Sequence, residues 1–164
     1  MHQDDIDELA AVLRGQDTTA AIEAATRMLE PVHPDAVAYA CSSGSFAGGP
    51  GYHLRIVDEL ERILGVPATT GTTACEVALR TLGAVDISVV TPYEQARNDI
   101  LVAVLEAQGF RVQALEAFTG WRSALPEFER IGLGLADLLN PEVAYRLGRR
   151  ANCAASDAVL VACT

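Results

Sequence analysis

The sequence predicts an α/β fold in which a parallel sheet carries helices on both faces. First, short apolar runs of strand length alternate with helical patterns of ten or more residues. Such alternation favours right-handed βαβ units. Second, the chain has 164 residues, of which half are hydrophobic, so it is long and apolar enough to bury a core. Third, one strand pattern occurs twice, which indicates a duplicated, two-lobed fold with pseudo-twofold symmetry.

Each element follows from local signals. Helical spacing of apolar residues, bounded by Thr caps and by Gly or Pro stops, predicts the helices. They cover residues 6–13, 18–29 and 54–64, a stretch ending near 82 after the Thr-rich run 69–73, and residues 94–107 and 141–152. Compact apolar runs predict strands over residues 35–40, 86–91, 110–115 and 157–162. Residues 41–51, rich in Ser and Gly, predict a loop, and residues 66–68 a connector.

The charge balance narrows the classes of partner. The chain has 22 acidic and 12 basic residues, a net charge of −10, and every basic residue is Arg. A nucleic acid or an anionic membrane surface demands a basic face, so neither is expected as the main partner. The absence of Lys excludes Schiff-base chemistry and a P-loop lysine within this chain. A small anionic substrate remains compatible, because a local pocket can oppose the overall field.

Compartment and cofactor are predicted from what the chain lacks. Its first residues are acidic, unlike a secretory signal, and no apolar run approaches the roughly 20 residues that span a bilayer. Four cysteines without a CxxC pair indicate reduced thiols in the cytoplasm. Histidine occurs only at positions 2, 33 and 53, which argues against a zinc site. His33 and His53 have no visible carboxylate partner, so surface or capping roles are expected.

The repeated pattern carries the candidate chemistry. Residues 35–42 and 157–164 both read D-A-V-x-x-A-C-[S/T], so Cys41 and Cys163 each follow a predicted strand. Ligands of parallel sheets bind at the carboxyl ends of the strands, where Tyr93 also falls. Backbone N–H groups there favour a thiolate.

Two such thiols admit two mechanisms. They could pass a proton across one carbon, or one could attack while the other protonates. The hydroxyls of Ser42, Ser43 and Ser45 would add donors to an anion cradle. The alternative is that Cys is merely a small residue suited to a buried strand end. Cys75 and Cys153 lack the matched context, and structural roles are expected for both.

These residues resemble a known family. The run Cys41–Phe46, read C-S-S-G-S-F, is similar to the first-cysteine motif of the aspartate/glutamate racemase superfamily. The similarity is greatest to its maleate cis–trans isomerase branch and to the related ectoine-utilisation and arylmalonate decarboxylase-like proteins. The Thr-rich run 67–73, the Thr-Pro-Tyr run 91–93 followed by Asn98, and residues 156–164 fit the same family in the same order.

The resemblance implies a flavodoxin-like, duplicated fold that needs no metal or organic cofactor and acts on a small carboxylate substrate. Cys41 would be the nucleophile that adds to the double bond of a diacid, and Cys163 its acid/base partner. A set of polar residues would bind the carboxylates: Ser42, Ser43, Tyr93, Asn98 and Thr164. Arylmalonate decarboxylases have Gly at the first position, so Cys41 argues against that branch. Enzymes of this kind often self-associate, and a homo-oligomer is expected.

The chain also departs from the family pattern. The usual first strand with its Ser/Asn-rich turn does not precede Cys41, and the chain stops one residue after Cys163. We therefore expect an internal portion of such a protein, truncated at both ends. Its lobes would be residues 1–90 and 91–164.

Two other functions stay open at this stage. A racemase of amino-acid or hydantoin type could use both cysteines for proton transfer. A catalytically inactive module could retain the cradle only to bind a carboxylate.

Overall fold

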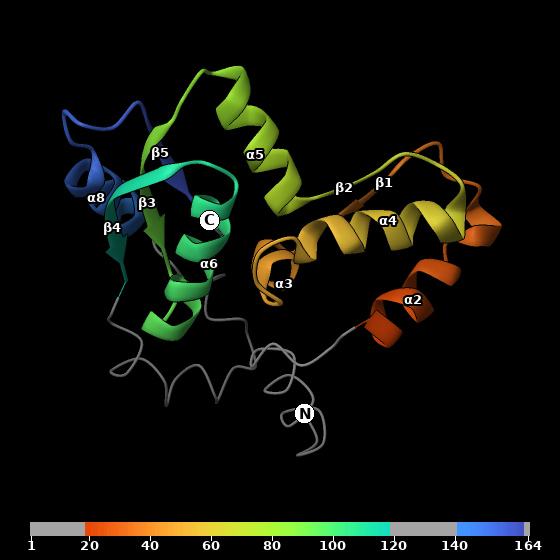
Figure 1. Ribbon diagram of the computed structural model, residues 1–164. Helices are drawn as coiled ribbons and strands as arrows, with labels where there is room; N and C mark the ends of the chain where they lie inside the picture. The colour runs from red at the N-terminus through yellow and green to blue at the C-terminus, as the bar shows by residue number, and fades with distance from the viewer. Residues whose placement is uncertain (1–18, 119–140, 163–164) are drawn as a thin grey trace, which may run out of the picture. The chain divides into compact units, whose positions relative to one another are not determined.

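The computed structural model describes residues 19–118 and 141–162, which belong to two compact units (Figure 1). The division between the units falls after Ala78. We describe each unit by itself. Their equivalence to the two predicted lobes, with a boundary near residue 90, stays a prediction, as does the pseudo-twofold relation.

The first unit contains a two-stranded parallel sheet. In chain order its elements are α2 (Thr19–Arg27), the 3-10 turn η1 (Glu30–Val32), β1 (Val37–Tyr39), α3 (Ser42–Phe46), α4 (Tyr52–Leu64), β2 (Ala68–Thr70) and the beginning of α5 (Gly71–Thr81). β1 and β2 run parallel, with Val37 opposite Ala68 and Tyr39 opposite Thr70. Their carboxyl ends therefore lie side by side, and the chain passes from β1 to β2 through α3 and α4.

An apolar cluster joins α4 to α2 and to the sheet. Tyr52, Ile56 and Leu60 recur every four residues on one face of α4, and they pack with Ile22 of α2. Val37, Tyr39 and Ala68 contact this cluster from the strands. α4 ends at Gly65, whose left-handed backbone (φ 66°) lets its N–H bond the Glu61 carbonyl.

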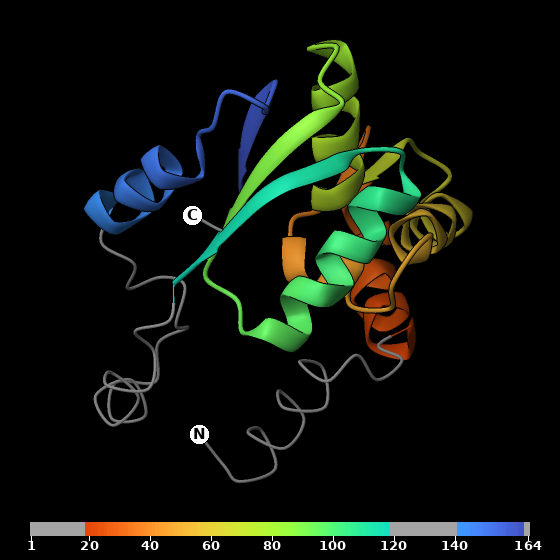
Figure 2. The ribbon, with the colours of Figure 1, turned by 60° about the vertical axis from the view of Figure 1, so that its left-hand side comes forward.

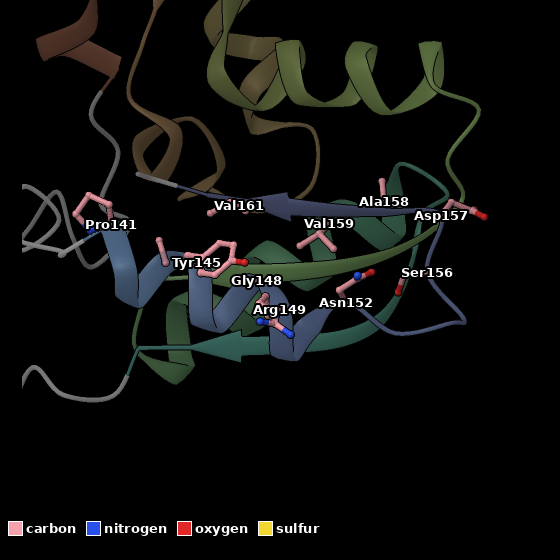
Figure 3. A pocket seen from close by; sticks show the side chains of 11 residues that line it. Pro141, Tyr145, Gly148, Arg149, Asn152, Ser156, Asp157, Ala158, Val159 and Val161 are labelled. Carbon is pink, nitrogen blue, oxygen red and sulfur yellow. The ribbon is translucent and has the colours of Figure 1, made fainter.

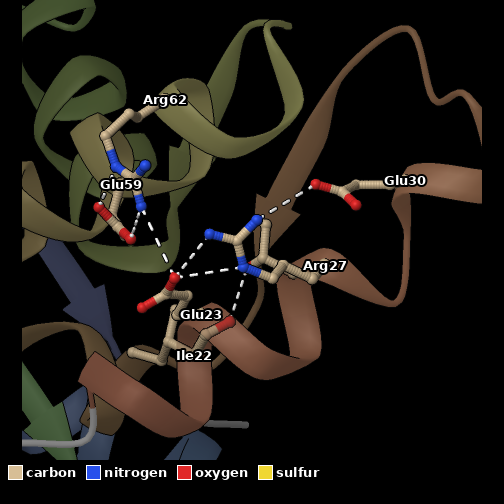
Figure 4. A network of polar contacts seen from close by, with 7 residues as sticks. Ile22, Glu23, Arg27, Glu30, Glu59 and Arg62 are labelled. Carbon is tan, nitrogen blue, oxygen red and sulfur yellow. Dashed lines mark hydrogen bonds and ion pairs between the residues drawn. The ribbon is translucent and has the colours of Figure 1, made fainter.

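Charged side chains border the same contact between α2 and α4 (Figure 4). Arg27 pairs with Glu23 at 2.7 Å, and Arg62 pairs with Glu59 at 2.6 Å and with Glu23 at 3.8 Å. Both arginines are about half exposed to solvent, so these pairs add little to stability. The apolar cluster beneath them holds the two helices together.

The second unit is a three-stranded parallel sheet with a helix on each face. Its elements are β3 (Asp86–Thr91), α6 (Gln95–Ala107), β4 (Arg111–Ala117), α8 (Pro141–Ala151) and β5 (Ala158–Val161). The strand order is β4-β3-β5, and β3 pairs in parallel with both neighbours. Figures 1 and 2 show α6 on one face of this sheet and α8 on the other. The chain passes from β3 to β4 through α6, and β5 pairs with the other edge of β3.

The central strand β3 explains why its sequence is apolar without alternation. Residues 87–91 are all buried, because helices cover both faces of the strand. Leu101, Val104 and Leu105 of α6 are buried, and Leu147 and Ala151 of α8 pack with Val90.

The predicted α/β class with parallel strands is confirmed. All four predicted strands form within two residues of their expected ends. Three short elements were missed: the 3-10 turn η1 after the predicted helix 18–29, α3 in the predicted Ser/Gly loop, and β2, which includes the last residue of the predicted connector. The predicted helix at residues 6–13 lies outside the described residues. Within the described ranges, no helix has the length and apolar character needed to cross a membrane.

Candidate active site

Cys41 stands at the carboxyl end of β1, where it caps the helix that follows. Its backbone is extended, and its carbonyl accepts the Ser45 N–H at 2.9 Å, the first bond of α3. Its Sγ accepts the Gly44 N–H at 3.3 Å and lies 3.7 Å from the Ser43 Oγ. The side chain is exposed to solvent. The thiol is thus held in place by a backbone donor while one side of it stays open to a reactant.

Tyr39 lies beside this thiol, and sequence reasoning missed it. Residues two apart in a strand point to the same side, which places Tyr39 and Cys41 on one face of β1. Burial, then the neighbouring Cys41 and Tyr52, raise the pKa of Tyr39 to about 12. The strand period itself was the available signal, since a Tyr precedes Cys41 by two positions.

A buried hydroxyl pair ties α3 to the start of α5. The Ser45 side chain is 0% exposed, and its Oγ donates to the Ser42 carbonyl at 2.8 Å. The same Oγ lies 2.6 Å from the Thr72 Oγ1 and accepts the Thr72 N–H at 3.2 Å. Ser45 therefore joins α3 to α5, whereas the sequence predicted that its hydroxyl would donate to a bound anion. Ser42 and Ser43 remain half-buried next to Cys41.

Small residues let the carboxyl ends of β1 and β2 approach closely. A Cβ on Gly71 would lie 3.2 Å from the Ser42 Cα and 3.1 Å from its Oγ. Thr70 caps the beginning of α5, because its Oγ1 accepts the Thr73 N–H at 3.1 Å. The Thr-rich run 69–73 therefore both ends a strand and begins a helix.

In the second unit, Tyr93 lies in the turn after β3 and is 9% exposed. Asn98 of α6 is 1% exposed, and its Nδ2 donates to the Tyr93 carbonyl at 3.0 Å. Its Oδ1 accepts from the Thr91 hydroxyl at 2.7 Å, and the Thr91 Oγ1 accepts the Tyr93 N–H at 3.3 Å. Asn98 thus positions the turn that carries Tyr93. Arg97, which no motif marked, is buried to the same degree as Tyr93.

Cys163 and Thr164 lie outside the described residues. Their contributions to a site stay predictions. Since each unit is described by itself, the structure brings together Cys41, Ser42 and Ser43 in the first unit and Tyr93 and Asn98 in the second.

Three other side chains can be compared with their predicted roles. Cys75 is half-buried, and burial raises the pKa of its thiol. Cys153 has a polar setting that the sequence did not show: its Sγ lies 3.2 Å from the Ser156 Oγ, and hydrogen bonds, chiefly that of Ser156, lower its pKa. Cys153 precedes β5 in the chain. His53 is not at the surface, since it is 2% exposed and its Nε2 lies 3.6 Å from Glu76 Oε2.

A groove of about 750 Å³ lies between α8 and β5 in the second unit (Figure 3). Its lining includes the half-buried Val159 of β5, together with Tyr145 and Arg149 of α8. The Arg149 guanidinium carbon lies 6.0 Å from the centroid of the Tyr145 ring. The groove contains none of the predicted site residues. In the described part of the chain, no group of three or more His, Cys, Asp or Glu side chains is arranged to hold a metal ion.

The described residues form α/β units with parallel strands, and the candidate site centres on Cys41 at the end of β1. The sequence profile of the arylmalonate decarboxylase family matches residues 14–164, nearly the whole chain. The chain therefore belongs to the arylmalonate decarboxylase family.

Individual relatives are similar over part of their length. Maleate isomerase of Nocardia farcinica is 32% identical over 84 residues, which are 48% of this chain and 34% of that protein. The maleate isomerase Iso of Pseudomonas putida S16 superposes with a TM-score of 0.73 at 21% identity, over 88% of this chain and 57% of that one.

A cysteine-to-serine mutant of the N. farcinica enzyme, with a covalently bound succinylcysteine intermediate, gives a TM-score of 0.71 at 23% identity, over 86% and 56% of the two chains. At these identities, the two structures show a shared fold. The chain spans about a third to three fifths of the length of these relatives.

Proposed function

We propose that this chain carries the cysteine centre of a cofactor-free isomerase that interconverts the cis and trans forms of a small dicarboxylate, maleate and fumarate being the simplest pair. The observation that carries the proposal is the exposed Cys41 thiol, held at the carboxyl end of β1 by the Gly44 N–H. The similarity to a maleate isomerase and the succinylcysteine seen in a related fold support the same chemistry.

In the proposed reaction the Cys41 thiolate adds to one alkene carbon. The sulfur–carbon bond forms while the π electrons move to the second carbon, where the adjacent carboxylate delocalises them. The Cys163 thiol then protonates that carbon. The former double bond is now single, so it rotates. Cys163 takes back a proton, the double bond re-forms and the sulfur–carbon bond breaks, which returns the electrons to Cys41. Atoms and electrons balance without an oxidant or a cofactor.

Polar groups near the two strand ends are proposed to hold the carboxylates. Ser42 and Ser43 flank the thiol in the first unit, and Tyr93 would bind from the second. Asn98 would act mainly through Tyr93, since both ends of its amide bond the turn. Thr164 completes the proposed set from its place after Cys163.

The thiol at position 41 supports an isomerase over a decarboxylase within this family. Addition to a double bond requires a nucleophile at the position of Cys41. The arylmalonate decarboxylases that this chain resembles have Gly there. The assignment therefore depends on Cys41 more than on any other residue.

The test is an assay of the 164-residue chain with maleate, followed by proton NMR for fumarate. We expect fumarate from the wild type and from Cys75→Ser, the matched control at a half-buried thiol. Cys41→Ser should lower turnover by on the order of 10³-fold or more, as loss of a nucleophile does elsewhere. Undiminished turnover in Cys41→Ser would overturn the assignment. Maleate that slows alkylation of Cys41 without being converted would point instead to a carboxylate-binding module.

A further inference from the structure

We propose that Tyr39 is a positioning residue for Cys41, with its phenol O–H donating a hydrogen bond to the sulfur of the thiolate. The inference rests on the proposed role of Cys41 as nucleophile. It adds a residue that the repeat, the motifs and the family pattern did not mark.

The surroundings of Gly44 place the phenol and the thiol together. A Cβ built on Gly44 would lie 3.1 Å from the Cys41 Sγ and 3.2 Å from the Tyr39 Cζ, and it would clash with the Tyr39 Oη. The tyrosine hydroxyl and the cysteine sulfur therefore converge over one glycine Cα. Burial first, and then the neighbouring Cys41, raise the pKa of Tyr39, which agrees with this proximity. The proposed bond from the Tyr39 O–H would be the second donor to the thiol, beside the Gly44 N–H.

Packing and strand pairing restrict the orientation of the Tyr39 ring. It packs against the apolar cluster of Ile22, Tyr52, Ile56 and Leu60, and its backbone pairs with Thr70 across the sheet. A ring held by a core on one side and by strand pairing on the other has few orientations. The side-chain entropy of Tyr39 is therefore already lost on folding, so a hydrogen bond from its hydroxyl requires little further ordering.

The phenol of Tyr39 is protonated at neutral pH, as a hydrogen-bond donor must be. Burial, followed by the charge of the nearby Cys41, raises the pKa of Tyr39 to about 12, so the phenol keeps its proton throughout the neutral range. A neutral donor stabilises an anionic sulfur more than the thioether of a covalent adduct, which is a weak acceptor. Tyr39 thus favours both the thiolate before addition and its departure when the product forms.

The two halves of the repeat differ at this position. Val161 stands in the second repeat where Tyr39 stands in the first. A phenol two residues before the cysteine therefore distinguishes the proposed nucleophile from its proposed acid/base partner.

The experiment compares alkylation of Cys41 by iodoacetamide in the wild type and in Tyr39→Phe, with each thiol quantified separately by peptide mass spectrometry. At neutral pH, we expect Cys41 to react about tenfold more slowly in Tyr39→Phe, since a hydrogen bond to a charged group stabilises it by about that factor. The difference should close at high pH, where both thiols are ionised. Cys75 is the internal reference, and Tyr145→Phe, at an exposed tyrosine of α8, is the matched control.

Gly44→Ala provides a second route to the same state, because its methyl group occupies the place of the Tyr39 hydroxyl. With the fold checked by circular dichroism, it should slow Cys41 alkylation in the same pH-dependent way. An alkylation profile of Tyr39→Phe that matches the wild type at every pH would overturn the inference, since a merely structural ring leaves the profile unmoved. Slower alkylation in a chain that makes no fumarate would leave the inference standing and remove the proposed function.

Discussion

The two units secure the carboxyl ends of their strands in different ways. In the first, Ser45 and Thr72 join segments that lie 27 residues apart, so the position of Cys41 depends on two separate stretches of chain. In the second, Thr91, Tyr93 and Asn98 bond one another within seven residues, so the turn that carries Tyr93 is closed locally. One candidate site residue is held by tertiary contact and the other by its own turn.

This difference has a consequence for chemistry. A thiol whose support comes from two segments can be displaced by a change in either of them, even one far away in the sequence. A tyrosine held within one turn should respond only to changes in that turn. Substitutions at the supporting residues, ordered by expected effect on stability, test whether the two ends behave in this way.

The largest effect is expected from Asn98→Ala in the second unit. The side chain is almost fully buried, and its removal takes one hydrogen bond from the Tyr93 carbonyl and one from the Thr91 hydroxyl. We expect a loss of about 2–3 kcal/mol in the free energy of unfolding, since buried groups left unsatisfied cost about 1–3 kcal/mol. Urea unfolding with an unchanged slope is the measurement.

Gln95→Ala is the matched control, because Gln95 is an amide on the same helix that bonds the exposed Asp99. It should change stability by less than about 0.5 kcal/mol. Equal losses in the two variants would mean that the turn around Tyr93 does not depend on the buried amide.

A smaller loss is expected from Ser45→Ala in the first unit, about 1–2 kcal/mol, because a buried hydroxyl pair is broken and the Thr72 N–H loses its acceptor. The same variant should also change Cys41 alkylation, since α3 is no longer tied to α5. Ser43→Ala is its counterpart: half-buried beside the thiol, it should leave unfolding nearly unchanged. Equal losses of unfolding free energy in Ser45→Ala and Ser43→Ala would contradict a supporting role for Ser45.

The same contrast explains what the sequence could and could not predict. The turn at residues 91–98 is held by hydrogen bonds between residues close in sequence. The end of the strand and the beginning of the next helix were therefore predictable from the local pattern. The three-residue strand β2 and the five-residue helix α3 exist because of contacts with distant segments, namely the pairing of Tyr39 with Thr70 and of Ser45 with Thr72. No local period marks such short elements.

Candidate residues divide in a similar way. The repeat located Cys41 at a strand end, because the pattern and the position lie within eight residues. It gave no sign that Ser45 supports the site, nor that His53 lies buried near Glu76, since both depend on packing across the unit. Tyr39 was within reach of the two-residue strand period, but a Tyr in a strand is usually read as part of the core.

The smallest effect on stability is expected at Asp157, the first residue of the second repeat, which corresponds to Asp35 in the first repeat. Asp157 Oδ2 accepts the backbone N–H groups of Val85 and Asp86, each at 2.9 Å, and these bonds hold its pKa below the ordinary value of about 3.8. A carboxyl whose pKa is lowered on folding contributes stability that is present above its unfolded pKa. That stability is lost as the pH falls through the folded pKa.

Asp157→Asn should therefore lower the midpoint of thermal unfolding by about 1–2 °C near neutrality. The deficit should shrink as the pH falls below the ordinary value of about 3.8, and it should vanish below the lowered pKa of the folded state. Asp35→Asn, at the matching exposed position of the first repeat, is the control and should leave the unfolding midpoint near neutrality closer to that of the wild type. A deficit for Asp157→Asn that persists unchanged in strong acid would show that the amide disturbs packing, because a carboxylate that has already been protonated has no charge left to lose.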